Sequence, residues 1–344
     1  MRRFSTLKTL ALAAVMMLTG IQPSLAEAVK PEKGNVVISK IYYGRSKNKA
    51  DNKSYSWGGF IEIYNNSATP VNVAGLKLGI VEADAPNLAW TRDRMTEAHP
   101  DQIAIRQVFQ IPGTEKILEP GNSLLLVNSA IDHRDISDFE CDLSGADYEA
   151  KDNQNKFPNN ENVPALDLNY SYIASISYML LAQTGACSTV LFTTDQDVAS
   201  LPTVFQYGKE KGNTNIIMPK SWVIDGVEIV AKGADASNKR LYDDIDKGYF
   251  VPGEGYTGGR IYRKTASIEA DGRKVLMDTD NTTDDFQYST TIQPREYDSE
   301  VAAIQTIKTS HHAENMVIYT LQGVRLNQLQ KGLNIVNGKK VVIK

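Results

Sequence analysis

The stretch Val36-Val37-Ile38-Ser39-Lys40-Ile41-Tyr42-Tyr43 decides the fold of this 344-residue chain. Its β-branched and aromatic residues, bounded by Gly34 and Gly44, are typical of a β-strand. Similar runs recur at short spacing and predict further strands at 60–64, 71–73, 76–81, 104–111, 123–128, 177–181, 190–194, 204–207 and 223–230. Only one short helix is expected, around 88–95. The pattern therefore predicts an all-β protein.

Apolar and polar residues alternate strictly in the run 76–81. Such alternation is typical of a strand with one face on the core and the other in water. We therefore expect one face of this strand to be solvated.

The composition excludes several classes of protein. The chain has 42% hydrophobic residues and a formal charge of −4, from 37 basic and 41 acidic side chains. These values exclude gross disorder, a collagen and a polytopic membrane protein. A mildly acidic chain is also a poor electrostatic partner for nucleic acid, so we expect no nucleic-acid ligand.

The first 26 residues have the layout of a secretory signal peptide. Arg2, Arg3 and Lys8 precede an apolar run over 10–18, and the small-residue site Ser24-Leu25-Ala26 follows. The run is too short to span a bilayer, which needs about 20 apolar residues. We expect export to the periplasm or the outer surface, with no membrane span left after cleavage.

The chain has two cysteines, Cys141 and Cys187. In an oxidising compartment they could form one disulfide that closes a loop of about 45 residues. Two separate thiols are the alternative, and the sequence leaves both open.

Two polar stretches interrupt the strand pattern. Residues 132–169 hold three clusters rich in Asn, Asp and Glu, and residues 232–247 are similar. We interpret both as surface segments, and the first as a long insertion. Long ordered loops are often functional, so we expect a partner-binding face there.

Several of these segments together resemble a known domain. The stretches at 38–43, 59–65, 70–76 and 118–121 resemble the successive strands and turns of lamin-tail domains, and 222–228, 260–264 and 278–286 resemble the closing half. The segment 142–149 further resembles an uncharacterised lamin-tail-like family of exported Bacteroidota proteins. The resemblance implies an immunoglobulin-like β-sandwich over 35–300, with 132–169 inserted. It implies no established activity.

The C-terminal residues 314–344 form a separate β module in this interpretation, after a linker at 301–313. Asn337-Gly338 between two apolar runs is a strong hairpin signal, because a type I′ turn needs two positive φ values. The module resembles a short type IX sorting domain. A structural hairpin is the alternative.

The acidic run 278–285 is the candidate metal site. Asp278, Asp280 and Asp284 offer oxygens at a spacing that suits calcium. An EF-hand is excluded because Thr283 and Ser289 stand where it needs Gly and Glu. A set of turns that Asx side chains stabilise is the alternative.

Exposed aromatic side chains are the candidate binding surface. Trp57, Trp90 and Tyr256 are expected in or beside loops, where aromatic rings can stack on sugars or peptides. Such rings also serve as buried anchors of loops, and both interpretations stay open.

No catalytic constellation is found. The four histidines, His99, His133, His311 and His312, are expected in solvated loops, and no Gly-x-Ser-x-Gly motif occurs. The sequence thus predicts an exported, non-enzymatic β-sandwich that binds a protein or surface polymer, or acts as a scaffold. The alternatives are a calcium-supported carbohydrate or surface-polymer module, and a hydrolase with a hidden site.

Overall fold

The computed structural model describes residues 27–181 and 187–302, and in the C-terminal segment 318–320, 324–326, 329–336 and 339–343. Its contacts divide the chain into two units, residues 1–301 and 302–344, which we treat separately. The expected signal peptide, and the expected linker from residue 303 onward, lie outside the described residues. In the described part of the chain, no helix is long and apolar enough to cross a membrane.

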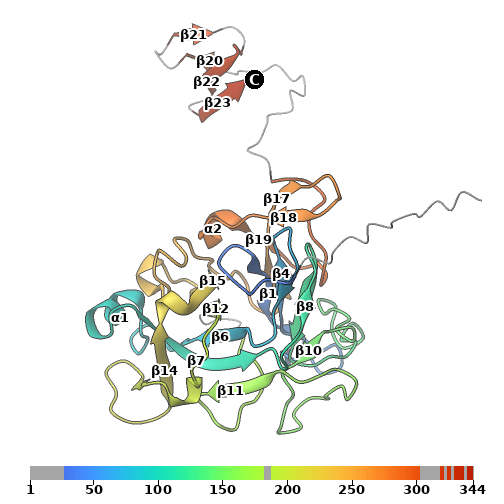
Figure 1. Cartoon of the computed structure of the whole chain (residues 1–344), viewed down its shortest axis with the longest axis vertical. Coiled ribbons are helices and arrows are strands. Elements are labelled where there is room, and N and C mark those ends of the chain that lie inside the picture. The colour runs from blue at the N-terminus through green and yellow to red at the C-terminus, as the bar shows by residue number, and fades with distance from the viewer. Residues whose placement is uncertain are drawn as a thin grey trace, which may run out of the picture. The chain divides into compact units, whose positions relative to one another are not determined.

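The first sheet has β1 near its centre (Figure 1). Its six strands run in the order β10-β9-β4-β1-β16-β19. They span β1 (Val36–Gly44), β4 (Phe60–Asn65), β9 (Ser123–Val127), β10 (Tyr148–Glu149), β16 (Gly259–Arg263) and β19 (Phe286–Ser289). All nine residues of β1 are buried, so this sheet is covered on both faces.

The second sheet has the strand order β13-β14-β7-β6-β12-β15, and β11 also pairs with β7. These strands are β6 (Lys77–Val81), β7 (Gln102–Gln110), β11 (Asp167–Ser171), β12 (Thr189–Phe192), β13 (Thr203–Phe205), β14 (Thr214–Pro219) and β15 (Val223–Val227). Short helices and strand pairs fill the connections: α1 (Arg92–Ala98), α2 (Thr282–Asp285), η1 (Val198–Ser200), η2 (Lys220–Trp222), η3 (Ala236–Asn238), β2 (Ser46–Lys47), β3 (Ser54–Tyr55), β5 (Val71–Asn72), β8 (Ile117–Leu118), β17 (Thr265–Ile268) and β18 (Lys274–Leu276).

The main core lies between the two sheets. Both sheets contribute aliphatic side chains to one continuous cluster, among them Ile38, Ile61, Leu78 and Leu191. Burial of apolar area between two such faces is the main stabilising contribution in a sandwich. The predicted all-β sandwich is confirmed.

Both polar stretches cover the sandwich: most of their residues are at least partly exposed, and a few apolar side chains pack on the sheets. Cys141, Leu143 and Val163 of the stretch 132–169 pack on the outer face of the first sheet. Leu241 and Ile245 of the stretch 232–247 pack on the second sheet. The expected solvated face of β6 is wrong for the same reason, because all five of its residues are buried.

The segment 177–181 is not a strand, although its sequence predicts one. Side-chain amides of the sandwich take the place of a strand ladder there. Asn128 Nδ2 donates to Met179 O at 3.0 Å, and Leu180 N donates to Gln107 Oε1 at 2.9 Å. The helix predicted at 88–95 is present but begins later, at Arg92.

The C-terminal unit is a small sheet in the order β21-β20-β22-β23. Its strands are β20 (Ile318–Tyr319), β21 (Arg325–Leu326), β22 (Gly332–Val336) and β23 (Lys339–Ile343). Val336 pairs with Lys339, so β22 and β23 form an antiparallel pair whose connection is residues 337–338, which lie outside the described part.

Candidate functional site

A buried ion pair lies at the centre of the first sheet. Lys40 of β1 and Glu62 of β4 are opposite in register, and Lys40 Nζ lies 3.2 Å from Glu62 Oε2. Both side chains are fully buried. Burial lowers the pKa of Lys40, although the charge of Glu62 opposes the shift. A buried charge is tolerated only when it is paired and hydrogen-bonded, so the remaining donors of Lys40 need acceptors.

Those acceptors belong to the loop 293–297. Lys40 Nζ donates to Gln293 O at 2.7 Å and to Glu296 O at 3.0 Å. Glu62 Oε2 accepts from Arg295 N at 2.9 Å, and Glu62 Oε1 accepts from the Tyr297 hydroxyl. The buried pair therefore holds this loop against the sheet.

Tyr297 is a partly buried side chain of that loop. Its hydroxyl oxygen also lies 2.8 Å from Ser39 Oγ. Burial raises the pKa of Tyr297 well above its ordinary value, and the neighbouring charge of Glu62 raises it further. Tyr297 therefore stays a neutral phenol whose proton is directed at Glu62.

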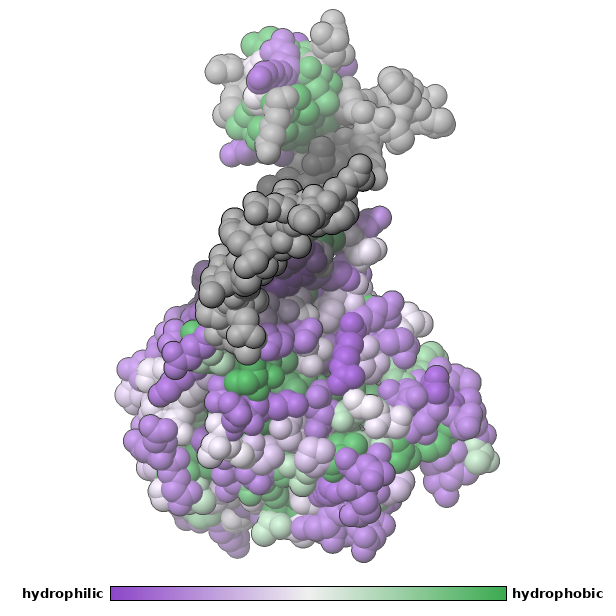
Figure 2. All heavy atoms as spheres, turned by 45° about the vertical axis from the view of Figure 1, so that its right-hand side comes forward, coloured by the Kyte–Doolittle hydropathy of each residue, from purple (hydrophilic) through white to green (hydrophobic). Residues whose placement is uncertain are grey.

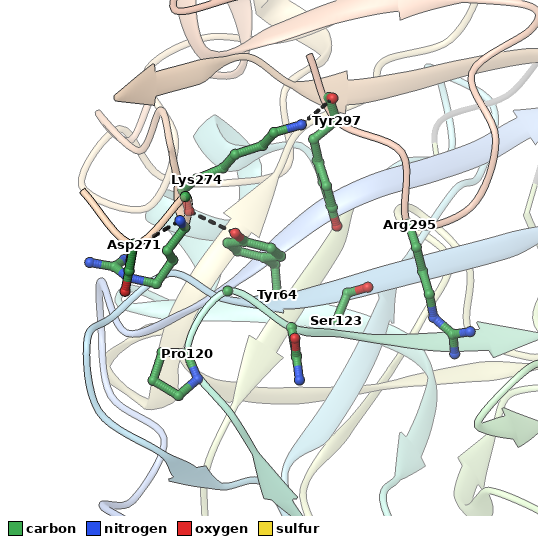
Figure 3. A pocket seen from close by; sticks show the side chains of 11 residues that line it. Tyr64, Pro120, Ser123, Asp271, Lys274, Arg295 and Tyr297 are labelled. Atoms are coloured by element: carbon green, nitrogen blue, oxygen red, sulfur yellow. Dashed lines mark hydrogen bonds between the residues drawn. The ribbon is translucent and has the colours of Figure 1, made fainter. Parts of the chain in front are cut away.

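The loop forms one wall of a pocket of about 700 Å³. Figure 3 shows the rings of Tyr64 and Tyr297 between Asp271 on one side and Arg295 on the other. The two rings meet edge to face at 5.0 Å. The Tyr64 hydroxyl donates to Lys274 O at 2.6 Å, which ties the hairpin β17–β18 to the sheet.

Basic side chains predominate around this pocket. Arg273, Lys274 and Arg295 line it, whereas Asp271 is its one lining carboxylate among the described residues. Arg295 pairs with Asp147 at 2.7 Å. Arg273 Nη1 donates to Asn66 O at 3.3 Å, and Lys274 Nζ donates to Tyr297 O at 2.5 Å. In the part of the chain that the structure describes, neither has a carboxylate within ion-pair distance. The pocket is thus suited to an anionic group.

In this structure the three expected calcium ligands have partners within the protein, and the calcium site stays a prediction. Asp278 Oδ1 lies 3.2 Å from Arg263 Nη1, and Asp280 Oδ2 lies 3.0 Å from Lys33 Nζ. Asp284 Oδ2 accepts from Asn281 Nδ2 at 2.6 Å. Over the described residues, no group of three or more His, Cys, Asp or Glu could hold a metal. The alternative of turns matches the geometry, because the Asn281 side chain caps α2 by accepting from Thr283 N.

The three candidate aromatic residues do not form one surface. The Trp57 ring stacks on Phe157 with centroids 4.3 Å apart, and Trp90 Nε1 donates to Phe205 O at 2.6 Å. Both tryptophans therefore anchor loops. Tyr256 is exposed, with Lys47 Nζ 4.0 Å from the centre of its ring. No ring contact joins any two of the three in the described structure.

His133 is buried, which corrects the expectation of a solvated histidine. Its Nδ1 lies 2.6 Å from the Tyr55 hydroxyl, and its Nε2 lies 2.8 Å from Ser129 O. Burial lowers its pKa. His99 contacts the Trp90 ring edge to face, and His311 and His312 lie outside the described residues.

Of the two alternatives that the sequence leaves open for the cysteines, the structure shows a thiol at Cys141 and not a disulfide with Cys187. Cys141 Sγ accepts a hydrogen bond from Arg260 Nη1 at 2.8 Å, and burial raises its pKa. Cys187 lies in the main core between the sheets, whereas Cys141 lies in the cluster on the outer face of the first sheet.

The sequence did not single out the basic residues of the pocket. Glu62 was predicted only as part of a strand, although a carboxylate is rare in a run as apolar as Phe-Ile-Glu-Ile-Tyr. A second charged residue in an apolar strand, Lys40, was the available signal for a buried pair. Arg273, Lys274 and Arg295 carry no such signal, since basic residues in turns are common.

Comparison with known proteins supports the architecture. The family model "Protein of unknown function (DUF4876)" matches residues 119–293. The crystal structure of a DUF4876 family protein from Bacteroides thetaiotaomicron VPI-5482 superposes with a TM-score of 0.64. The two are 22% identical, over 74% of this chain and 71% of that one, so the likeness concerns the fold. No curated protein matches. Because the family model spans half of the sequence, this chain belongs to the DUF4876 family of proteins of unknown function.

Proposed function

We propose that this protein is an exported, non-enzymatic binding protein of the periplasm or outer surface. Its cationic pocket, lined by Tyr64, Tyr297, Arg273, Lys274 and Arg295, would take an anionic group of a surface polymer. The signal-peptide layout supports export. The resemblances to lamin-tail domains and to sorting domains, which stay predictions, point to the same setting.

The observation that carries the proposal is the unbalanced positive charge of the pocket. The chain as a whole is acidic, at −4, yet basic side chains outnumber acidic ones here. Among the described residues, the side chains of Arg273 and Lys274 have only carbonyl partners, so an incoming carboxylate, phosphate or sulfate would supply the missing charge. The face in Figure 2 is mainly hydrophilic with small separate hydrophobic patches, which suits a polar ligand better than a broad apolar one.

The same geometry favours binding over catalysis. Tyr297 keeps its proton and directs it at Glu62, so it is a poor nucleophile. Hydrolysis of a glycosidic bond needs a pair of carboxylates, and Asp271 is the one carboxylate that lines this pocket in the described structure.

Calorimetric titration with polygalacturonate, an anionic polymer, tests the proposal, with dextran as the neutral control. We expect binding of polygalacturonate that weakens as salt rises, because screening acts on exposed charges. The double variant Arg273→Ala/Lys274→Ala is expected to lose at least tenfold in affinity, since each charged hydrogen bond contributes about 1.5–3 kcal/mol.

The matched control removes two other basic side chains. Lys209 and Lys211 lie in an exposed turn, and no side-chain partner of either is described. Lys209→Ala/Lys211→Ala changes the net charge by the same amount and is expected to keep the affinity. Equal losses in both double variants would mean that only overall charge matters and would refute the pocket. Absence of binding would refute it as well.

A further inference from the structure

A second pocket, of about 890 Å³, lies where four neighbouring strands of the second sheet end. The strands β11, β7, β6 and β12 are adjacent in that order. The polar residues Asn169, Gln110, Lys77 and Thr193, from these strands or directly after them, all line the pocket. Neighbouring strands lie about 4.8 Å apart, so the row extends over about 14 Å.

The strand register explains why these side chains gather. Lys77 is directly opposite Gln110 on one side and Phe192 on the other, so Lys77 and Gln110 share one face of the sheet. Asn169 occupies a bulge of β11, between Leu168 and Tyr170. A bulge redirects a side chain out of the regular alternation.

Three members of the row have unused hydrogen-bonding capacity. Asn169 is a partly buried residue whose Oδ1 is shielded from solvent and has no hydrogen-bond partner among the described residues. The side chains of Gln110 and Thr193 form no hydrogen bond within the described residues. Asn72, in the same pocket, differs from these three. Its side chain accepts hydrogen bonds from Ala74 N and Lys116 N and donates one to Thr114 O. A buried polar atom without a partner needs an explanation, and a ligand is one.

The charges in this pocket balance, unlike those of the first. Lys30 and Lys77 are matched by Asp195 and Asp197, and the other polar lining residues are amides and hydroxyls. Such a surface favours a neutral ligand with many hydroxyl groups. A peptide added as a strand is disfavoured, because β6 is already paired on both sides, with β7 and with β12.

We propose that this amide-lined pocket is a second binding site, separate from the cationic one, and that it takes a short neutral oligosaccharide. Asn169, Gln110 and Thr193 exchange hydrogen bonds with its hydroxyl groups. Lys77 Nζ, which donates to Thr194 O at 2.9 Å, holds the adjoining loop, whose residues 194–198 also line the pocket.

Titration of the full chain with maltohexaose, cellohexaose, xylohexaose and mannohexaose tests this, with a neutral Gly-Ser decapeptide as the competing ligand class. We expect at least one hexasaccharide to bind and the decapeptide not to bind. Gln110→Ala/Asn169→Ala is expected to lower the affinity at least tenfold, because two ligand hydrogen bonds are removed. Its melting temperature should stay close to that of the parent, since neither side chain bonds the described protein.

The cationic pocket supplies the cross-control. Arg273→Ala is expected to leave the binding of the hexasaccharide unchanged, and Gln110→Ala/Asn169→Ala to leave the binding of polygalacturonate unchanged. The proposal is overturned if no hexasaccharide binds, if the decapeptide binds in their place, or if the Gln110→Ala/Asn169→Ala variant keeps the parent affinity.

Discussion

Two buried clusters of oppositely charged residues stabilise different parts of the molecule. In the first, Lys40 meets one carboxylate, Glu62, and both bond the loop that borders the cationic pocket. In the second, Arg263 meets three carboxylates, Asp225, Asp278 and Asp285, at 2.8, 3.2 and 3.3 Å. The second cluster includes part of the acidic run in which calcium was expected.

The difference shows where a ligand site arises. The carboxylates of the second cluster converge on an internal cation that joins β16 of the first sheet to β15 of the second, so they serve the fold. The first cluster uses its hydrogen bonds to position a loop, and the basic residues around that loop are left without full counter-charge. The candidate site is therefore marked by the basic residues that lack full counter-charge, and not by the densest run of charged residues.

Removal of Arg263 should have the largest effect. Arg263→Met leaves two buried carboxylates, Asp225 and Asp285, and the partly buried Asp278 without their cation. Loss of one partner of a buried pair costs about 3–5 kcal/mol. We expect that loss in the free energy of unfolding, measured with denaturant. Arg273→Ala, at the rim of the cationic pocket, is the control and should cost about 1 kcal/mol or less. A cost for Arg263→Met as small as that would contradict the structural role of the cluster.

The Lys40–Glu62 pair can be broken or replaced. Lys40→Met leaves Glu62 buried without its cation and should cost about 3 kcal/mol. Lys40→Met/Glu62→Leu removes both charges and should recover part of that stability, because an apolar pair avoids the desolvation penalty.

The same double variant distinguishes the effect of the pair on stability from its effect on ligand binding. Without Lys40 and Glu62, the loop 293–297 loses the bonds that hold it, so binding of polygalacturonate should fall while the protein stays folded. Denaturant unfolding and calorimetry on the same samples check both. A double variant less stable than Lys40→Met, or one with intact binding, would argue against this arrangement.

The second cluster should make stability depend on pH. Burial raises the pKa of Asp225 to about 7, against the charge of Arg263. The folded state then keeps a proton that the unfolded chain releases near pH 4. The stabilising contribution is therefore full below about pH 4 and is lost as pH rises to about 7, a change of at most about 4 kcal/mol. Unfolding curves across this range should slope downward for the parent and less for Asp225→Asn. Equal slopes would contradict the assignment.

Calcium should have the smallest effect. The carboxylates of the acidic run already bond Arg263, Lys33 and Asn281. A change of about 1 °C or less in melting temperature is therefore expected on adding calcium or a chelator, since a metal stabilises only the state that binds it. A clear rise in melting temperature on adding calcium would support the metal site that the sequence suggested.

Much of the fold could be predicted, because strands such as β1 and β4 carry dense β-branched and aromatic runs. The packing of 132–169 on the sandwich could not be predicted, because its sequence is polar. Its polar side chains find hydrogen-bond partners within the protein; Glu149, for example, accepts from Ala130 N and Asn160 N. The site itself was not predicted from the sequence, which placed Glu62 only in a strand. Tyr297 and Arg295 reach it through contacts more than 230 residues apart in sequence, which local patterns do not encode.

Hydrogen–deuterium exchange with and without polygalacturonate tests the central claim most directly, because it locates the ligand without a variant. The cationic pocket predicts added protection in three segments, 120–123, 271–274 and 293–297, and no change at 193–198 in the neutral pocket. Protection confined to other segments, or none at a concentration that saturates the calorimetric titration, would contradict it.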